Sequence, residues 1–226
     1  MSPTLSLPQA LLLLTLKDET GRPKAGFYKP AIAGAALSEL LLSGAITLTD
    51  DKKPKVIVSS DAQSNSPFLM LCLEKIRATK KPRDMTYWAS KLGQTKYLIP
   101  TLAQELCELG ALREETSKVL GVFTMTSWPE ASPELESTLK QQLETALFGT
   151  GDVDEHTCVL IALAKSADVL RYNFDRKALK AHKERIKAIT TGDLLAAGAT
   201  DKAIKAAQTA MIAAVSAAVV TTTVAS

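Results

Sequence analysis

The sequence predicts a mainly α-helical protein, a single globular helical domain around a buried core helix, with short β-hairpins. Three observations predict this fold class. Several apolar segments begin at helix-capping residues, and leucines recur every four residues from Leu135 to Leu147. Two of the helical segments end at a glycine and lead into alternating apolar residues. No linker, low-complexity block or charge run divides the 226 residues, so we assign residues 1–226 to one domain.

The composition is that of an ordinary globular protein, with 46% hydrophobic and 23% charged residues. A net charge of +3 at pH 7 is too small to indicate a nucleic-acid partner by itself. Cys72, Cys107 and Cys158 are isolated, and each lies in an apolar stretch. This usage predicts buried thiols in a reducing compartment rather than a disulfide framework.

The N-terminal stretch LSLPQALLLLTLKDETG contains four successive leucines, which raises the questions of export and membrane insertion. No Lys or Arg precedes the leucines, and a charged turn follows them where a signal peptide would offer small neutral residues. A membrane span would need about 20 apolar residues. Ser6 and Gln9 instead have the spacing of a capping box, and Pro8 falls in the first turn. The stretch therefore predicts a first helix that is buried all round.

The next segments predict a helix followed by a β-hairpin, and the arrangement occurs twice. The helix from Ile32 to Ser43 ends before Gly44, where a left-handed residue is favoured. The alternating residues around ITL and in KVIVSS then form a hairpin. The helix from Pro100 to Leu109 ends before Gly110 in the same way, and SKVLGVFTMTS supplies a second strand pair.

Shorter helices separate and follow these hairpins. Ser66–Pro67 begins one helix, and MTYWASKLG forms another that is closed by Gly93. After Ser132–Pro133, leucines recur every four residues and predict a third helix. The segment TCVLIALAKSADVL is apolar nearly all round, so we expect it to be the central core helix.

The C-terminal part contains two contrasting helical patterns. DRKALKAHKERIKAI has a thin apolar stripe on a cationic helix, formed by Leu179, Ile186 and Ile189. The last helix is predicted from about Asp201 toward Val219. Residues 206–226 carry no charge, but they are mostly Ala, Ser and Thr with one Gln, which give little transfer energy into lipid. We therefore expect a packed core helix there rather than a membrane span.

The inventory of reactive residues argues against an enzyme, a metal site or a cofactor. Neither His156 nor His182 has a second ligand at metal-binding spacing, and no phosphate-binding glycine loop or nucleophile elbow is present. Glu39 and Asp168 stand in apolar helices. A carboxylate with a shifted pKa would be a functional interpretation. The absence of catalytic partners nearby favours structural roles, on an exposed turn or beside a neighbouring helix end.

Two groups of cations are candidates for contact with an anionic surface. Between Arg171 and Lys187, seven Lys and Arg face two acidic residues, which also fits a solvated helix face. The second group is RPKAGFYKP, where cations alternate with aromatics. Its members are Arg22, Lys24, Phe27, Tyr28 and Lys29. This pattern suits a membrane interface, because aromatic rings dip while Lys pairs with phosphate, and it also suits an ordinary loop.

Six stretches, in order, carry a resemblance to a known family: LSLPQALLLLTLKDETG, GAALSELLLSGAITL, VSSDA, WASKLG, ELCELGAL and SADVL. The chain resembles the Golgi phosphoprotein three family from about Leu5 to about Val219. No single stretch is specific, but the ordered set is. The resemblance implies a mostly α-helical domain around a buried core helix, decorated with short hairpins.

The resemblance also implies a function. Eukaryotic members are cytoplasmic peripheral membrane proteins of the Golgi that bind the head group of phosphatidylinositol 4-phosphate in a shallow basic pocket. They act as trafficking adaptors by binding the cytosolic tails of membrane enzymes. A hairpin before the central helix, matched here by residues 148–157, implies membrane contact and self-association.

In a gapless match, this chain has Lys24 where the family's lipid pocket has a Trp, and Ala33 where it has an Arg. Lys96 and Ile99 stand where the family has a pair of Arg residues. The residues that we expect to contact an anionic lipid head group are Lys24, Phe27, Tyr28, Lys29 and Lys96. Two alternatives stay open. One is a winged-helix-like nucleic-acid binder, although the helices before the two glycines have almost no Lys or Arg. The other is a protein-interaction scaffold without lipid affinity.

Overall fold

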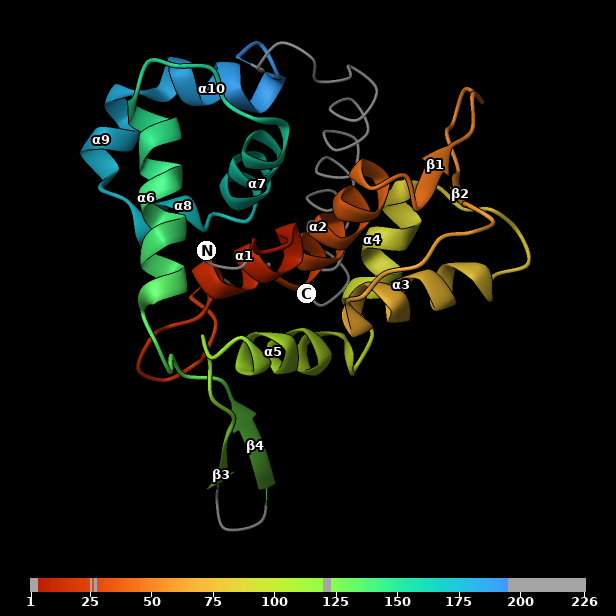
Figure 1. Ribbon diagram of the computed structural model, residues 1–226, viewed down its shortest axis with the longest axis horizontal. Helices are drawn as coiled ribbons and strands as arrows, with labels where there is room; N and C mark the ends of the chain where they lie inside the picture. The colour runs from red at the N-terminus through yellow and green to blue at the C-terminus, as the bar shows by residue number, and fades with distance from the viewer. Residues whose placement is uncertain (1–3, 25, 27, 120–122, 195–226) are drawn as a thin grey trace, which may run out of the picture.

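A computed structural model describes residues 4–24, 26, 28–119 and 123–194, which form helices and two small antiparallel sheets (Figure 1). The helices are α1 (Leu7–Thr15), α2 (Tyr28–Leu42), α3 (Pro67–Arg77), α4 (Met85–Gly93), α5 (Leu98–Glu108), α6 (Glu134–Phe148), α7 (Glu155–Ser166), α8 (Leu170–Asn173), α9 (Arg176–Ala181) and α10 (Lys183–Thr191). The strands are β1 (Ile46–Leu48), β2 (Val56–Val58), β3 (Glu115–Val119) and β4 (Phe123–Ser127). The predicted mainly α-helical class with short hairpins is confirmed. The assignment of the whole chain to one domain stays a prediction.

Helix α1 lies in the middle of the fold and contacts α2, α5, α6 and α7 (Figure 1). Its predicted start is confirmed: Ser6 is the N-cap, and Gln9 Oε1 accepts a hydrogen bond from the Ser6 N–H at 3.0 Å. Each residue from Leu11 to Leu14 is at most 1% exposed. The four leucines are therefore core residues.

Helix α2 begins at Tyr28, one turn before the predicted start at Ile32. Pro30 does not prevent this, because the first turn of a helix needs no N–H donor there. Gly44 adopts φ = 72° after the helix end, as predicted. The first hairpin is also confirmed, with Thr47 opposite Ile57, and its strands contact α2 and α3.

The next two helices begin as predicted, but α4 ends differently. Ser66 Oγ accepts a hydrogen bond from the Leu69 N–H at 3.1 Å and so caps α3. Gly93 is the last helical residue of α4 rather than a left-handed cap, and its C-cap is Gln94 in a right-handed conformation. A Cβ on Gly93 would lie 3.3 Å from the backbone of Pro30. The glycine therefore serves the close approach of α4 to the start of α2.

Helix α5 leads into the second predicted hairpin. Gly110 adopts φ = 75° after the helix, as expected. Strands β3 and β4 pair with Ser117 opposite Met125. The hairpin projects from the helices at one end of the molecule (Figure 1).

The predicted spacing of leucines in α6 is confirmed, because Leu139, Leu143 and Leu147 are buried. Helix α7 is buried from Cys158 to Ala164 and contacts α1, α2, α6 and α10. It is a core helix, as predicted, and it shares the centre of the fold with α1.

The predicted cationic helix is two helices, α9 and α10, which meet at His182. The break is held by His182 itself: Nδ1 donates a hydrogen bond to the carbonyl oxygen of Ala178 at 3.0 Å, and the ring packs on Phe148. Ile186 and Ile189 are buried, as the apolar stripe predicts. The helix predicted from Asp201 toward Val219 lies outside the described residues.

The described cysteines are free thiols. Cys72 and Cys158 are buried, as expected, whereas Cys107 is partly exposed. Over the described ranges, no helix combines the length and the apolar character that crossing a membrane requires.

Candidate functional site

The chain turns back on itself directly after α1. The Lys17 N–H donates to the Arg22 carbonyl oxygen at 2.9 Å, and the Gly21 N–H donates to the Lys17 carbonyl oxygen at 2.7 Å. The Lys24 N–H then donates to the Thr15 carbonyl oxygen at 2.7 Å. These bonds fix residues 17–24, which we call the α1–α2 loop, against the end of α1.

Gly21 allows this loop to touch the segment that follows β4. Its φ is +59°, and a Cβ there would lie 2.1 Å from the backbone carbonyl carbon of Trp128. No side chain fits at that distance, and φ in this region also favours glycine. The Glu130 N–H donates to the Asp18 carbonyl oxygen at 2.8 Å and joins the same two segments.

The contact leaves a groove of about 280 Å³ between the α1–α2 loop, α2, α5 and β4. Its lining includes Arg22, Tyr28, Ile99 and Trp128. Leu16, Gly21, Pro23 and residues 125–127 complete it. The groove therefore combines aromatic and apolar walls with one guanidinium. Such a combination is typical of sites for a ligand that has both an anionic group and an apolar part.

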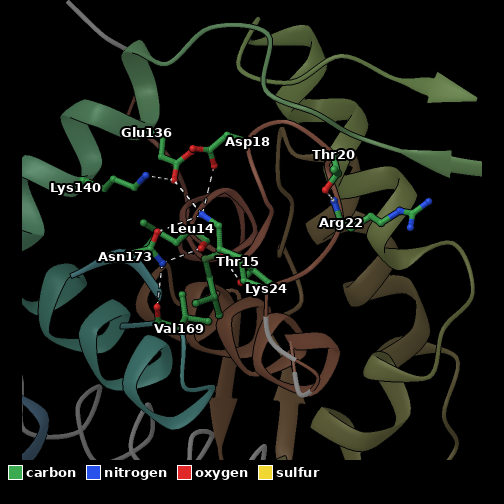
Figure 2. Close-up of polar contacts among 11 residues, drawn as sticks. Leu14, Thr15, Asp18, Thr20, Arg22, Lys24, Glu136, Lys140, Val169 and Asn173 are labelled. Carbon is green, nitrogen blue, oxygen red and sulfur yellow. Dashed lines mark hydrogen bonds and ion pairs between the residues drawn. The ribbon is translucent and has the colours of Figure 1, made fainter. Parts of the chain in front are cut away.

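Lys24 points into the fold (Figure 2). Its ammonium lies 3.4 Å from Asp18 Oδ1, 3.5 Å from Asn173 Oδ1 and 3.8 Å from Glu136 Oε1. The Lys24 side chain is 14% exposed. Asn173 Nδ2 in turn donates to the carbonyl oxygens of Leu14 and Val169, each at 2.9 Å. Lys24 thus ties the α1–α2 loop to α6 and α8.

The network around Lys24 contains more acidic than basic groups. The Glu136 carboxylate is buried and also lies 2.6 Å from Lys140 Nζ. Burial, together with the charges of Glu136 and Asp18, raises the pKa of Glu130, which lies beside them. A cation at position 24 is therefore needed inside the fold to balance these carboxylates.

Arg22 has the opposite orientation. Figure 2 shows its side chain extending away from Asp18 and Glu136. Among the residues that the structure describes, the guanidinium has no hydrogen-bond or ion-pair partner. Sequence reasoning noted Arg22 among the cations of RPKAGFYKP but left it out of the expected lipid site. It missed Trp128 altogether, because only the fold brings that residue to the loop.

Two of the expected site residues follow the loop at the start of α2. Tyr28 lines the groove and is half-buried, and Lys29 is exposed. Burial raises the pKa of Tyr28 above its ordinary value of 10.0. Phe27 lies outside the described residues.

Lys96 precedes α5 and is exposed, with its ammonium 5.6 Å from the ring centroid of Tyr97. Ile99, three residues later, lines the groove. Ala33 is fully buried. Since Gly93 packs on the backbone of Lys29 and Pro30, Lys96 and Lys29 belong to neighbouring segments.

The structure places the projecting hairpin at β3–β4 rather than at residues 148–157. In that range, α6 ends at Phe148 and α7 begins at Glu155. The residues between them form a connection whose last residue, Asp154, is the N-cap of α7. The Asp154 carboxylate accepts a hydrogen bond from the Thr157 N–H at 2.9 Å. The acidic residues there serve the start of a helix, so residues 148–157 form a connection between two helices and no hairpin.

The other singled-out carboxylates have structural roles, as expected. Glu39 accepts a hydrogen bond from the Leu7 N–H at the start of α1. Asp168 is half-exposed, has φ = 63° and pairs with Arg171. Within the described part of the chain, no cluster of His, Cys, Asp and Glu is arranged to hold a metal ion.

Comparison with known protein families identifies the family of the chain. The model of the family described as Golgi phosphoprotein 3 (GPP34) matches residues 7–221. No curated protein matches the chain.

Proposed function

The chain belongs to the Golgi phosphoprotein 3 (GPP34) family, and we propose that it is a peripheral membrane adaptor that binds anionic lipid head groups in the groove beside Arg22. The head group implied by the resemblance is that of phosphatidylinositol 4-phosphate. The proposed site consists of Arg22, Tyr28, Lys29, Lys96 and Trp128, with Phe27 as an expected neighbour. Lys24 supports the site from behind.

The observation that carries this proposal is the free guanidinium of Arg22 at the groove. A guanidinium offers two parallel N–H donors that match a phosphate group. The cations of the inner network are neutralised by carboxylates, whereas Arg22 has no such partner in the described structure. An exposed, uncompensated cation beside an aromatic groove fits a phosphate that is carried by a lipid.

The surrounding side chains add charge and apolar surface. Each of Lys29 and Lys96, near an anionic bilayer, would contribute about 1 kcal/mol to binding. The Tyr28 hydroxyl would donate to a phosphate oxygen, and the Trp128 ring would lie against the glycerol or acyl region. The β3–β4 hairpin, which ends beside the groove, would face the same surface.

Lys24 has a different role in this proposal from the one expected from the sequence. Its ammonium is held by Asp18, Glu136 and Asn173, so it positions the α1–α2 loop that carries Arg22. Direct contact with the lipid is assigned to the neighbouring cations, Arg22, Lys29 and Lys96.

Vesicle co-sedimentation tests the proposal. We expect the protein to pellet with phosphatidylcholine vesicles that contain phosphatidylinositol 4-phosphate, and less with pure phosphatidylcholine. Vesicles with an equal charge of phosphatidylserine separate recognition of the phosphorylated head group from general attraction to negative charge. Arg22→Glu and Lys29→Glu should each lower the bound fraction strongly.

The matched control is Lys187→Glu, which makes the same charge change on the exposed side of α10. It should leave pelleting unchanged. A loss for Lys187→Glu with wild-type binding of Arg22→Glu would mean that the cationic α9–α10 surface, rather than the groove, contacts the membrane. No pelleting with either anionic lipid would remove the proposal.

A further inference from the structure

The outer edge of strand β2 is paired at its start, where an antiparallel bridge joins Lys55 to Asp84, and is open at Val58 in the described structure. Backbone bonds join Thr49 to Lys55 and Ala45 to Ser59, so the odd-numbered residues of β1 and β2 bond across the hairpin. The even-numbered residues therefore direct their N–H and C=O groups outward. The Val56 N–H bonds the Arg83 carbonyl oxygen at 2.8 Å, which confirms this direction. In the described structure, the Val58 N–H and C=O have no partner.

A groove of about 240 Å³ runs beside this edge. Residues 56–58 form one wall, and Ile76, Thr79, Pro82 and Trp88 form others. Trp88 is 2% exposed, and its indole N–H has no hydrogen-bond partner among the described residues. A buried donor without an acceptor is costly. Val58, with its unpaired backbone groups, therefore lines the groove, and the buried Trp88 in its wall carries an unpaired donor.

The surface around the groove is cationic. Its exposed basic residues are Lys52, Lys53, Lys55, Arg77, Lys80, Lys81 and Arg83. The acids in the same segments are fewer, namely Asp50, Asp51, Glu74 and Asp84. Asp51 accepts a hydrogen bond from the Thr49 hydroxyl, and Asp84 caps α4. Lys81 lines the groove and has no partner in the described part of the chain.

We propose that the β2 edge binds an extended acidic peptide segment of a partner protein as an added strand. The Val58 N–H would donate to a peptide carbonyl oxygen, and the Val58 carbonyl oxygen would accept from a peptide N–H. Alternate side chains of a strand point to opposite faces, so acidic residues at every second position of the ligand can all face Lys81 and its neighbours. The Trp88 N–H would supply a further donor to the ligand.

This site is independent of the proposed lipid groove. The β1–β2 hairpin lies at a different end of the molecule from β3–β4 (Figure 1). A peptide at β2 and a membrane at the β3–β4 end would therefore bind without competing for the same surface. The inference goes beyond lipid binding and does not depend on it.

Fluorescence anisotropy with the full chain tests the inference. The probe is a dye-labelled peptide of alternating valine and glutamate, which favours an extended conformation and carries the required charge. The same peptide with lysine in place of glutamate is the charge control. We expect saturable binding of the acidic peptide, weakened by salt, and no binding of the basic one.

Three variants identify the site. Val58→Pro removes the outward N–H without removing a bond of the β1–β2 ladder, since that N–H does not belong to it. Trp88→Phe keeps an aromatic side chain and removes the donor, and Lys81→Glu reverses the charge. We expect each to weaken peptide binding by about tenfold, the effect of one lost hydrogen bond or charge contact. Lys187→Glu, on α10, should change it less than twofold.

The outcomes decide between the alternatives. Absence of acidic-peptide binding, equal binding of the basic peptide, or wild-type affinity in folded Val58→Pro and Lys81→Glu would overturn the inference. Circular dichroism and the urea midpoint establish whether Val58→Pro is folded. If it is not, Lys81→Glu and Trp88→Phe decide the result. Because the assay contains no lipid, its outcome is separate from that of the vesicle experiment.

Discussion

The carboxylate of Glu39 on α2 accepts a hydrogen bond from the backbone N–H of Leu7, the first residue of α1, over 2.7 Å. The same oxygen lies 3.2 Å from Nε2 of His156 at the start of α7. The first N–H groups of a helix have no partner within the helix, and a negative charge beside them is favourable. One side chain therefore connects three core helices.

Replacing Glu39 should destabilise the fold through α1. We expect Glu39→Ala to lower the free energy of unfolding by about 1–2 kcal/mol, because the Leu7 N–H loses its acceptor. Urea denaturation measures the change. The control is Glu74→Ala, an exposed glutamate of α3, which should shift the midpoint little. Equal shifts for the two variants would contradict the cap.

The same residue predicts a pH dependence. Burial by itself raises the pKa of Glu39. The hydrogen bonds from His156 and the Leu7 N–H, together with the charge of His156, lower the pKa by more, so that it lies below 4.5. A carboxyl whose pKa falls on folding stabilises the protein above its unfolded pKa and loses this effect as the pH falls through the folded one. The stability difference between wild type and Glu39→Gln should be largest above pH 4.5 and shrink below it. A difference that grows on acidification would refute this account.

Gly21 should tolerate no side chain. Gly21→Ala places a Cβ 2.1 Å from the Trp128 backbone at a positive φ, so we expect a loss of about 1–3 kcal/mol or a displaced loop. Gly26→Ala is the matched control, because a Cβ there meets nothing within 4 Å. Thermal or urea unfolding compares the two. The prediction fails if Gly21→Ala is as stable as Gly26→Ala.

Lys24 and Lys29 should behave differently when each becomes methionine. Lys24→Met leaves the buried Glu136 with one cation fewer, and we expect it to lower the free energy of unfolding by about 1–3 kcal/mol. Lys29→Met should keep wild-type stability and weaken vesicle binding, because Lys29 is exposed and has no partner in the described structure. Urea unfolding and co-sedimentation measure both variants. The reverse pattern would assign Lys24 to the lipid and Lys29 to the fold.

The cysteines should react at different rates with a thiol reagent. Burial raises the pKa of Cys72 to about 12 and, together with Asp154 and Glu155, that of Cys158 to about 12. Cys107 also has a raised pKa, first from burial and then from Glu114 and Glu108, but its side chain is partly exposed. We expect native protein to be labelled first at Cys107 and at the other two only on unfolding. Peptide mass spectrometry reads the order, and equally fast labelling of Cys72 would contradict it.

Local signals predicted most elements correctly. Ser6, Gln9 and Pro8 specify the start of α1 within one turn, and Gly44 and Gly110 mark helix ends through a backbone conformation that other residues avoid. These signals depend on neighbours in the chain. Gly93 resembled them in sequence, yet its role is contact with Pro30, which only the packing of α4 on α2 reveals.

The candidate site was harder to predict for the same reason. Lys24 and Lys29 look alike in RPKAGFYKP, but Lys24 meets Asn173, 149 residues away in sequence. Arg22 is left free because Asp18, four residues earlier, turns toward Lys24. Whether a cation is paired or available depends on such long-range contacts, and a single sequence does not show them.

Helix α1 is made before every other described element, yet its polar ends are completed by residues made much later. The Leu7 N–H donates its hydrogen bond to Glu39 of the next helix. The Leu14 carbonyl oxygen accepts one from Asn173, 159 residues downstream. A helix of nine residues is too short to be stable alone. During synthesis, α1 can therefore pack first on α2, whereas its C-terminal end stays incomplete until α8 has emerged.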